Sequence, residues 1–121
     1  MTINTILIVD DSPTDRQHLS NMLSQNGFKV STAESAEDAL AKVKQQRPDL
    51  VLMDVVMPGQ NGFQATRTLT RDESTKDIPV ILCTSKGQET DKVCGMRQGA
   101  RDYVVKPVVQ ADLLAKIAAL G

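Results

Sequence analysis

Five side chains that could take part in chemistry each follow a short apolar segment of this chain. They are Asp10 and Asp11 after residues 5–9, Asp54 after residues 50–53, Thr84 after residues 80–83, and Lys106 after residues 103–105. Such segments have the length and composition of buried strands, and the carboxyl ends of parallel strands meet at one edge of a sheet. We therefore expect three carboxylates, a hydroxyl and an ammonium group to gather at that edge.

The predicted carboxylate cluster calls for a cation. Asp10, Asp11 and Asp54 repel one another when they are pressed together, unless a positive ion joins them. Oxygen ligands suit a hard divalent ion, and Mg²⁺ binds through a few carboxylates while it keeps waters and accepts phosphate oxygens. The sequence therefore predicts a Mg²⁺ site.

Charge counting favours a phosphoryl group as the second occupant. Three carboxylates, one Mg²⁺ and Lys106 are neutral together, and a phosphoryl group on one carboxylate adds about one negative charge. The hydroxyl of Thr84 can donate to one phosphoryl oxygen, and Lys106 can pair with another. Asp54 follows the central, buried predicted strand and suits the nucleophile, whereas Asp10 and Asp11 can bind the metal from the side.

Each of these residues also has an ordinary structural interpretation. Asp11 could cap a helix, Asp10 could be a surface acid, and Asp54 could begin a turn. Lys106 could be a solvated surface lysine. Taken singly, these interpretations are favoured, but together at successive strand ends they require several coincidences.

Short apolar runs alternate with helical patterns along the whole chain. Strands are predicted over residues 5–9, 29–33, 50–53, 80–83 and 103–105. The helices are predicted from Pro13 to about residue 26, from Ser35 to about Gln46, from residue 62 to 69, from about Glu89 to Gln98, and from Gln110 to Leu120. Successive βα units indicate an α/β three-layer fold, and the flavodoxin-like strand order 2-1-3-4-5 with five helices is the common solution. We expect residues 1–121 to form a single domain with no output domain, because the last predicted helix reaches the end of the chain.

Composition excludes several classes of function. Lys and Arg total 14 against 15 Asp and Glu, so the general basic face of a nucleic-acid-binding protein is missing. No apolar stretch is long enough to span a membrane, and the first residues lack the pattern of a signal peptide. The two cysteines, Cys83 and Cys94, fit no disulfide framework or metal spacing, so we predict a cytoplasmic protein.

The sequence resembles the receiver domain of two-component response regulators, which are CheY-like proteins, over its whole length. The matching segments are Ile6–Asp11, Leu52–Asp54, Met57–Gly59, Cys83–Ser85, Gly99–Ala100 and Tyr103–Pro107. Residues 61–67 and 88–92 look most similar to stand-alone regulators of type IV pilus twitching motility, of the PilH type.

The resemblance implies a mechanism. Asp54 would accept a phosphoryl group from a CheA-like histidine kinase, becoming an aspartyl phosphate. Asp11, Asp54 and the carbonyl of Val56 would bind Mg²⁺, and Asp10 would reach the ion through water. Self-dephosphorylation would be slow at most, so the protein would not be an enzyme.

The resemblance also implies how a signal would leave the site. Thr84 and Tyr103 would form a switch pair that changes the face of the fourth helix, fifth strand and fifth helix toward a downstream motility protein. Lys106 and Pro107 would be joined by a cis peptide bond. Draining phosphate from a sister regulator stays open as an alternative output.

Other functions for this fold are less consistent with the residues. A flavodoxin-like cofactor binder would carry a phosphate-binding first turn and more aromatic residues than this chain has. An aspartyl-phosphate phosphatase would commonly place an acid two positions after the nucleophile, where this chain has Val56. A docking module that works without phosphorylation would not need the acids, Thr84 and Lys106 together. DNA binding is disfavoured by the charge balance.

Overall fold

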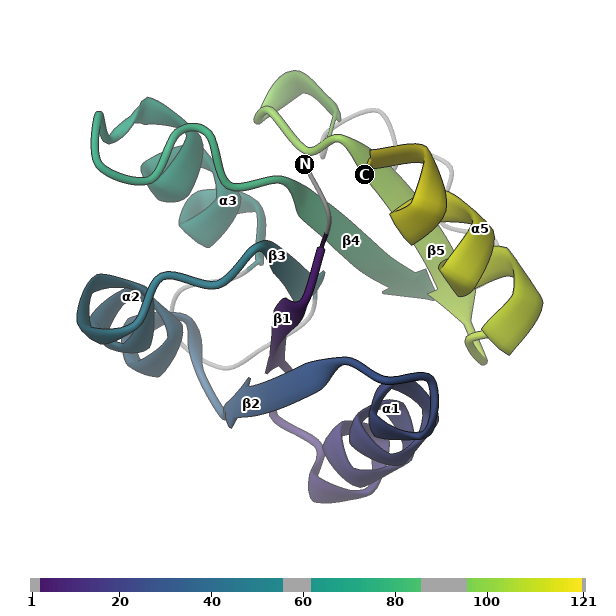
Figure 1. The fold of residues 1–121 in the computed structure, drawn as a ribbon. Coiled ribbons are helices and arrows are strands. Elements are labelled where there is room, and N and C mark those ends of the chain that lie inside the picture. The colour runs from purple at the N-terminus through teal and green to yellow at the C-terminus, as the bar shows by residue number, and fades with distance from the viewer. Residues whose placement is uncertain (1–2, 56–61, 86–95, 121) are drawn as a thin grey trace.

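A parallel sheet runs through the centre of the molecule in the order β2-β1-β3-β4-β5 (Figure 1). This computed structural model describes residues 3–55, 62–85 and 96–120. The strands are β1 (Thr5–Val9), β2 (Lys29–Ala33), β3 (Leu50–Asp54), β4 (Val80–Ser85) and β5 (Asp102–Lys106). The order confirms the predicted flavodoxin-like fold.

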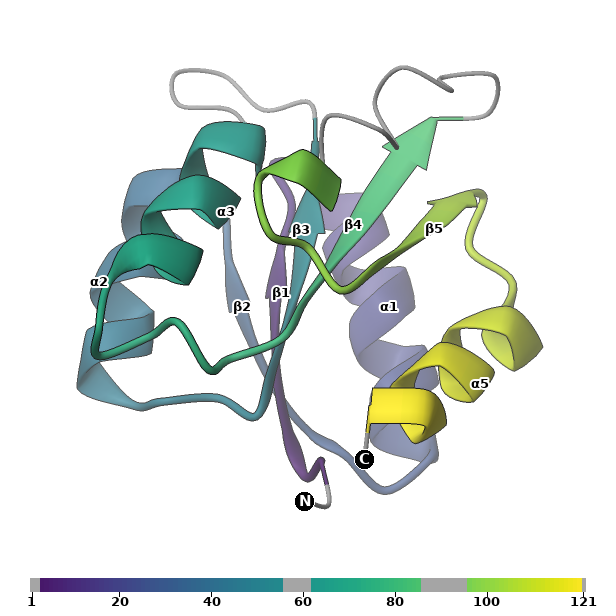
Figure 2. The ribbon, with the colours of Figure 1, turned by 90° about the horizontal axis from the view of Figure 1, so that it is seen from above.

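Helices cover both faces of the sheet. They are α1 (Pro13–Gln25), α2 (Ala36–Gln45), α3 (Gly62–Arg71) and α5 (Gln110–Leu120). Figures 1 and 2 show α1 and α5 on one face and α2 and α3 on the other. The further helix predicted from about Glu89 to Gln98 lies mostly outside the described residues, because residues 86–95 are not among them.

Local sequence explains where the first two helices begin. The side chain of Ser12 accepts a hydrogen bond from the backbone N–H of Asp15, and Pro13 occupies the first turn of α1. The side chain of Ser35 likewise accepts from the N–H of Asp38 at the start of α2. Both serines satisfy donors that a helix start leaves unpaired, and the first of them places α1 directly after the acidic end of β1.

Burial on both faces explains the apolar strands. Ile6 and Ile8 of β1 point into the core beneath α1 and α5, and Leu7 and Val9 point into the core beneath α2 and α3. β3 is buried at every position, whereas β2 at the sheet edge alternates exposed and half-buried residues before it ends at the buried Ala33. A two-sided core of this kind requires continuous apolar runs in the central strands.

Three strands extend further than the apolar pattern predicts. β3 includes Asp54, β4 includes Thr84 and Ser85, and β5 includes Lys106. The parallel pairing continues through Asp54 with Cys83 and through Ser85 with Lys106. The predicted ends after residues 53, 83 and 105 were therefore too early, because backbone pairing holds polar residues in a strand as readily as apolar ones.

Candidate functional site

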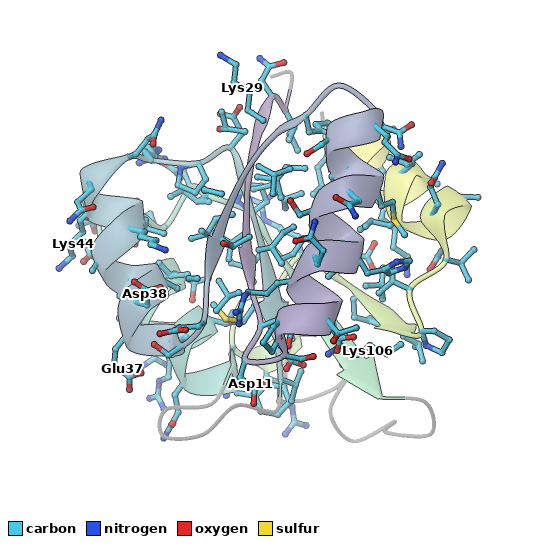
Figure 3. The ribbon with its side chains drawn as sticks, turned by 90° about the horizontal axis from the view of Figure 1, so that it is seen from below. Asp11, Lys29, Glu37, Asp38, Lys44 and Lys106 are labelled. Carbon is cyan, nitrogen blue, oxygen red and sulfur yellow. The ribbon has the colours of Figure 1, made fainter. Side chains whose placement is uncertain are left out.

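The three predicted acids meet at the carboxyl edge of the sheet. A carboxylate oxygen from each of Asp10, Asp11 and Asp54 lies within 4.8 Å of the other two. Asp10 and Asp54 are buried and Asp11 is exposed. Figure 3 shows Asp11 and Lys106 at the same end of the molecule, beside the start of α1.

Asp10 is held in place by several hydrogen bonds. Its Oδ1 accepts from the backbone N–H of Ser12 at 2.9 Å, and its Oδ2 accepts from Lys106 Nζ at 3.0 Å. Arg16 donates to its backbone carbonyl at 2.7 Å. Both carboxylate oxygens of Asp10 therefore already accept a hydrogen bond, an arrangement that suits a contact with an ion through water.

Asp54 is the buried acid at the centre of the cluster. It is 6% exposed, and the next N–H, from Val55, donates to the Cys83 carbonyl at 3.2 Å. Burial, and then the charge of Asp10, raise the pKa of Asp54 to about 6, against the opposing effect of Lys106. A carboxylate in this environment gains from any cation that joins it.

Lys106 reaches the cluster from the last position of β5. Its Nζ lies 3.0 Å from Asp10 Oδ2 and 3.2 Å from Asp54 Oδ1. Burial lowers the pKa of Lys106, but the hydrogen bond with Asp10 and the charge of Asp54 outweigh it, so the pKa is raised above its ordinary value. The ammonium group is therefore charged and within reach of anything bound to Asp54.

The remaining predicted residues flank this centre. Thr84 is buried on β4, and its hydroxyl donates to the Val104 carbonyl at 3.5 Å. This distance is at the limit of a hydrogen bond, so the hydroxyl loses little when it turns to another acceptor.

Tyr103 is half-buried on β5 beneath Lys116 of α5, whose Nζ lies 4.8 Å from the ring centroid. The Lys106–Pro107 peptide bond is cis, as the resemblance implies.

The carboxylates fit a magnesium ion. Ligand oxygens of one octahedral Mg²⁺ lie about 3 to 4 Å apart, given Mg–O distances near 2.1 Å, and the oxygens of the three acids lie within 4.8 Å of one another. The predicted fourth ligand, the carbonyl of Val56, lies outside the described residues. Asp11 and Asp54 would hold the ion, which would neutralise part of the charge of the acids.

One residue of the site was missed by sequence reasoning. Asp15 in the first turn of α1 lies 3.2 Å from Lys106 Nζ through its Oδ2. An acid in the first turn of a helix is common because it complements the helix dipole. The only sequence signal for a further role was therefore its position close after Asp10 and Asp11.

Removing the charge of Asp54 is expected to stabilise the metal-free protein. The folded pKa of about 6 exceeds the ordinary value of 3.8, so the folded state binds more protons than the unfolded state between these values, and stability falls as pH rises through them. At about pH 7.5 Asp54 is charged in both states, and the full loss of stability caused by its raised pKa is present. Water screens part of the nominal ~3 kcal/mol, so we expect Asp54→Asn to raise the free energy of urea unfolding by about 1 to 2 kcal/mol.

The control for this prediction is Glu73→Gln, which removes a carboxylate from an exposed pair with Lys76. Its effect should be within about 0.5 kcal/mol. About 10 mM Mg²⁺ should stabilise the parent more than Asp54→Asn, because the ion binds the folded carboxylates. An Asp54→Asn protein that is less stable than the parent at neutral pH without metal would contradict the raised pKa.

Comparison with known proteins agrees with this geometry. The family model for the response regulator receiver domain matches residues 6–118, and the chain belongs to that family. Receiver domains are signalling proteins that interact with kinases and with downstream proteins.

Among individual relatives, the chain is 58% identical over 115 residues to the protein PilH of Pseudomonas aeruginosa, covering 95% of each chain. It is also 40% identical to the phosphate regulon transcriptional regulatory protein PhoB of the same organism. That match covers 99% of this chain but only 52% of PhoB, about half of its length.

Solved structures give the same result. The chemotaxis protein CheY4 of Vibrio cholerae superposes with a TM-score of 0.91 at 31% identity, covering 99% of this chain and 100% of that chain. A response regulator from Chloroflexus aurantiacus superposes with a TM-score of 0.94 at 31% identity, over 98% of both chains. Within the described part of the chain, every helix is too short or too polar to cross a bilayer.

Proposed function

We propose that this chain is a phosphorylation-controlled switch in which Asp54 accepts a phosphoryl group from the phosphohistidine of a CheA-like kinase. The observation that carries the proposal is the burial of Asp54 between two further acids and the ammonium group of Lys106, 3.2 Å from Asp54 Oδ1. An isolated buried carboxylate would be costly, whereas this one lies among groups that suit a metal ion and a phosphate.

The proposed chemistry is a single displacement at phosphorus. A carboxylate oxygen of Asp54 forms the new O–P bond while the P–N bond to the histidine breaks, and the imidazole leaves with the electron pair and takes up a proton. Lys106, 25% exposed, pairs with a phosphoryl oxygen and neutralises part of its charge. Asp11 and Asp54 would hold a Mg²⁺ ion, which would neutralise the remaining charge of the site.

Thr84 and Tyr103 carry the proposed conformational response. The hydroxyl of Thr84, weakly bonded to Val104 at 3.5 Å, turns toward a phosphoryl oxygen and leaves space beside β5. The ring of Tyr103 then moves inward. The surface formed by β5, α5 and the helix predicted from about Glu89 to Gln98 then changes its affinity for a partner. The chain works in this proposal as one domain, residues 1–121, without enzymatic turnover beyond slow loss of its own phosphoryl group.

The test is the intact mass after incubation with acetyl phosphate. With Mg²⁺ the parent protein should gain one phosphoryl group, and without Mg²⁺ the gain should disappear. Asp54→Asn should show no gain, while Asp112→Asn, an exposed acid on α5, should behave as the parent. A gain that survives Asp54→Asn, or none in the parent, contradicts the proposal.

The downstream output that we propose is control of type IV pilus twitching motility. The support is the 58% identity to PilH along nearly the whole of both chains. Affinity capture with phosphorylated and unmodified protein distinguishes an active output from the phosphate-sink alternative. Stable capture of a motor or scaffold protein by the phosphorylated form alone supports the active output, and its absence supports the sink.

A further inference from the structure

A third carboxylate contacts Lys106 from the side of α1. Asp15 Oδ2 lies 3.2 Å from Lys106 Nζ, as close as Asp54 Oδ1, and Asp10 Oδ2 lies at 3.0 Å. An ammonium group has three N–H donors. Lys106 donates hydrogen bonds to Asp10 and Asp15 and forms an ion pair with Asp54, so all three carboxylates compete with a phosphoryl oxygen for this ammonium group.

The three partners of Lys106 differ in their exposure to water. The side chains of Asp10 and Asp54 are 2% and 8% exposed, whereas that of Asp15 is 46% exposed. The backbone of Asp15 is held by its hydrogen bond to the N-cap Ser12 at 3.3 Å, so the helix start aims this acid at the site. The pair forms part of the wall of a small surface pocket that Pro107 also lines, where water can reach Asp15.

We propose that Asp15 is a positioning residue that holds Lys106 in the unmodified protein and slows phosphoryl uptake by Asp54. This inference rests on the proposed function and assigns a role at the same site to an acid of α1 that lies outside the sheet edge. Asp15 acts on the reaction through Lys106 and need not touch the phosphoryl group.

Phosphoryl transfer turns the Asp54 carboxylate into an acyl phosphate and places phosphoryl oxygens near Lys106, so the ammonium group shifts toward them. As a carboxylate oxygen of Asp54 bonds to phosphorus, the bond between phosphorus and the donor breaks and the leaving group departs with the electron pair. The phosphoryl oxygens then need a donor from Lys106. Releasing Asp10 would leave a buried charge unpaired, whereas water readily replaces Lys106 at the half-exposed Asp15. Asp15 is therefore the partner that is released, and its charge opposes the approach of an anionic donor.

The test compares initial rates of phosphorylation by acetyl phosphate with saturating Mg²⁺, followed by intact mass. Asp15→Asn should react about two- to fivefold faster than the parent, the factor that corresponds to one partly exposed ion pair. Asp15→Glu, which keeps the charge and can still reach Lys106, should restore a rate close to the parent's. Glu73→Gln removes an equally charged but remote group and should leave the rate unchanged. The Asp15→Asn gain should shrink in high salt.

A second measurement needs no phosphorylation. Urea unfolding of the unmodified protein should show that Asp15→Asn is more stabilising, or less destabilising, in a Lys106→Met background than in the parent, because Asp15 is then surrounded by acids without its cation. Additive effects, or an Asp15→Asn rate at or below that of the parent, overturn the inference. If the parent takes up no phosphate at all, the proposed function fails and this inference fails with it, whereas a reactive parent with an unchanged Asp15→Asn rate removes this inference alone.

Discussion

Gly62→Ala is expected to lower the free energy of unfolding by about 3 kcal/mol, which is near the upper end for overpacking by one methyl group. A Cβ at residue 62 would lie 2.2 Å from the backbone carbonyl oxygen of Asp54 and 3.0 Å from Val55 Cα. Both are backbone atoms, one in the last residue of β3 and one directly after it, and that strand is buried on both faces. The chain must therefore move α3 or the end of β3, and either movement also displaces the proposed phosphoryl acceptor.

Urea unfolding measures this effect, with Gly27→Ala as the matched control. Gly27 has φ +90°, and a Cβ at this residue would have no other atom within 4 Å. Its substitution by alanine therefore costs backbone strain alone, about 1 kcal/mol of unfolding free energy. Helix propensity predicts the opposite sign at Gly62, since alanine in the first turn of α3 should stabilise the helix by up to ~1 kcal/mol. A Gly62→Ala protein as stable as the parent would contradict this prediction, because it would show that the space between α3 and the end of β3 accommodates a methyl group. Phosphate uptake from acetyl phosphate should fall together with stability.

Lys106→Met is expected to cost about 2 to 3 kcal/mol of unfolding free energy near neutral pH without divalent ions. The substitution keeps the apolar stem and removes the cation that lies 3.0 Å from Asp10 and 3.2 Å from Asp54. Breaking a fully buried ion pair from one side costs about 3 to 5 kcal/mol, and the partial exposure of Lys106 reduces this figure. About 10 mM Mg²⁺ should recover part of the loss because the ion supplies positive charge to the same carboxylates.

The pH dependence of this loss distinguishes it from a packing defect. Asp54 already has its pKa raised to about 6 with Lys106 present, and removing the cation raises it further, so lowering the pH from about 7.5 to 5 protonates Asp54 and shrinks the deficit. Lys76→Met serves as the control, since Lys76 pairs with Glu73 on the surface at 2.9 Å, and it should cost under about 1 kcal/mol. A deficit for Lys106→Met that is equal at both pH values would mean that lost packing, not unpaired charge, destabilises the variant.

The order of strands could be predicted because several local signals agree. Apolar runs of β-branched residues separated by helix starts such as Ser12–Pro13 and Ser35 indicate successive βα units, and handedness leaves few arrangements of such units. The observed order and the cores on both faces follow that expectation. Strand ends were predicted less well at Asp54, Thr84 and Lys106, because a polar residue gives no hydrophobic signal even where the backbone ladder continues.

The sequence by itself determined which residue types gather at the carboxyl edge, since Asp10, Asp11, Asp54, Thr84 and Lys106 all come at or near strand ends of one sheet. Only the tertiary structure decided which of these charged groups form ion pairs with one another. Lys106 Nζ joins Asp10, Asp54 and the unpredicted Asp15, and Gly62 packs against the Asp54 carbonyl. These contacts depend on how α1 and α3 pack against the strand ends, because a charge interaction is set by distances of a few ångströms between side chains. Sequence spacing does not encode such distances, whereas the alternation of apolar segments encodes the sheet that brings these residues within range.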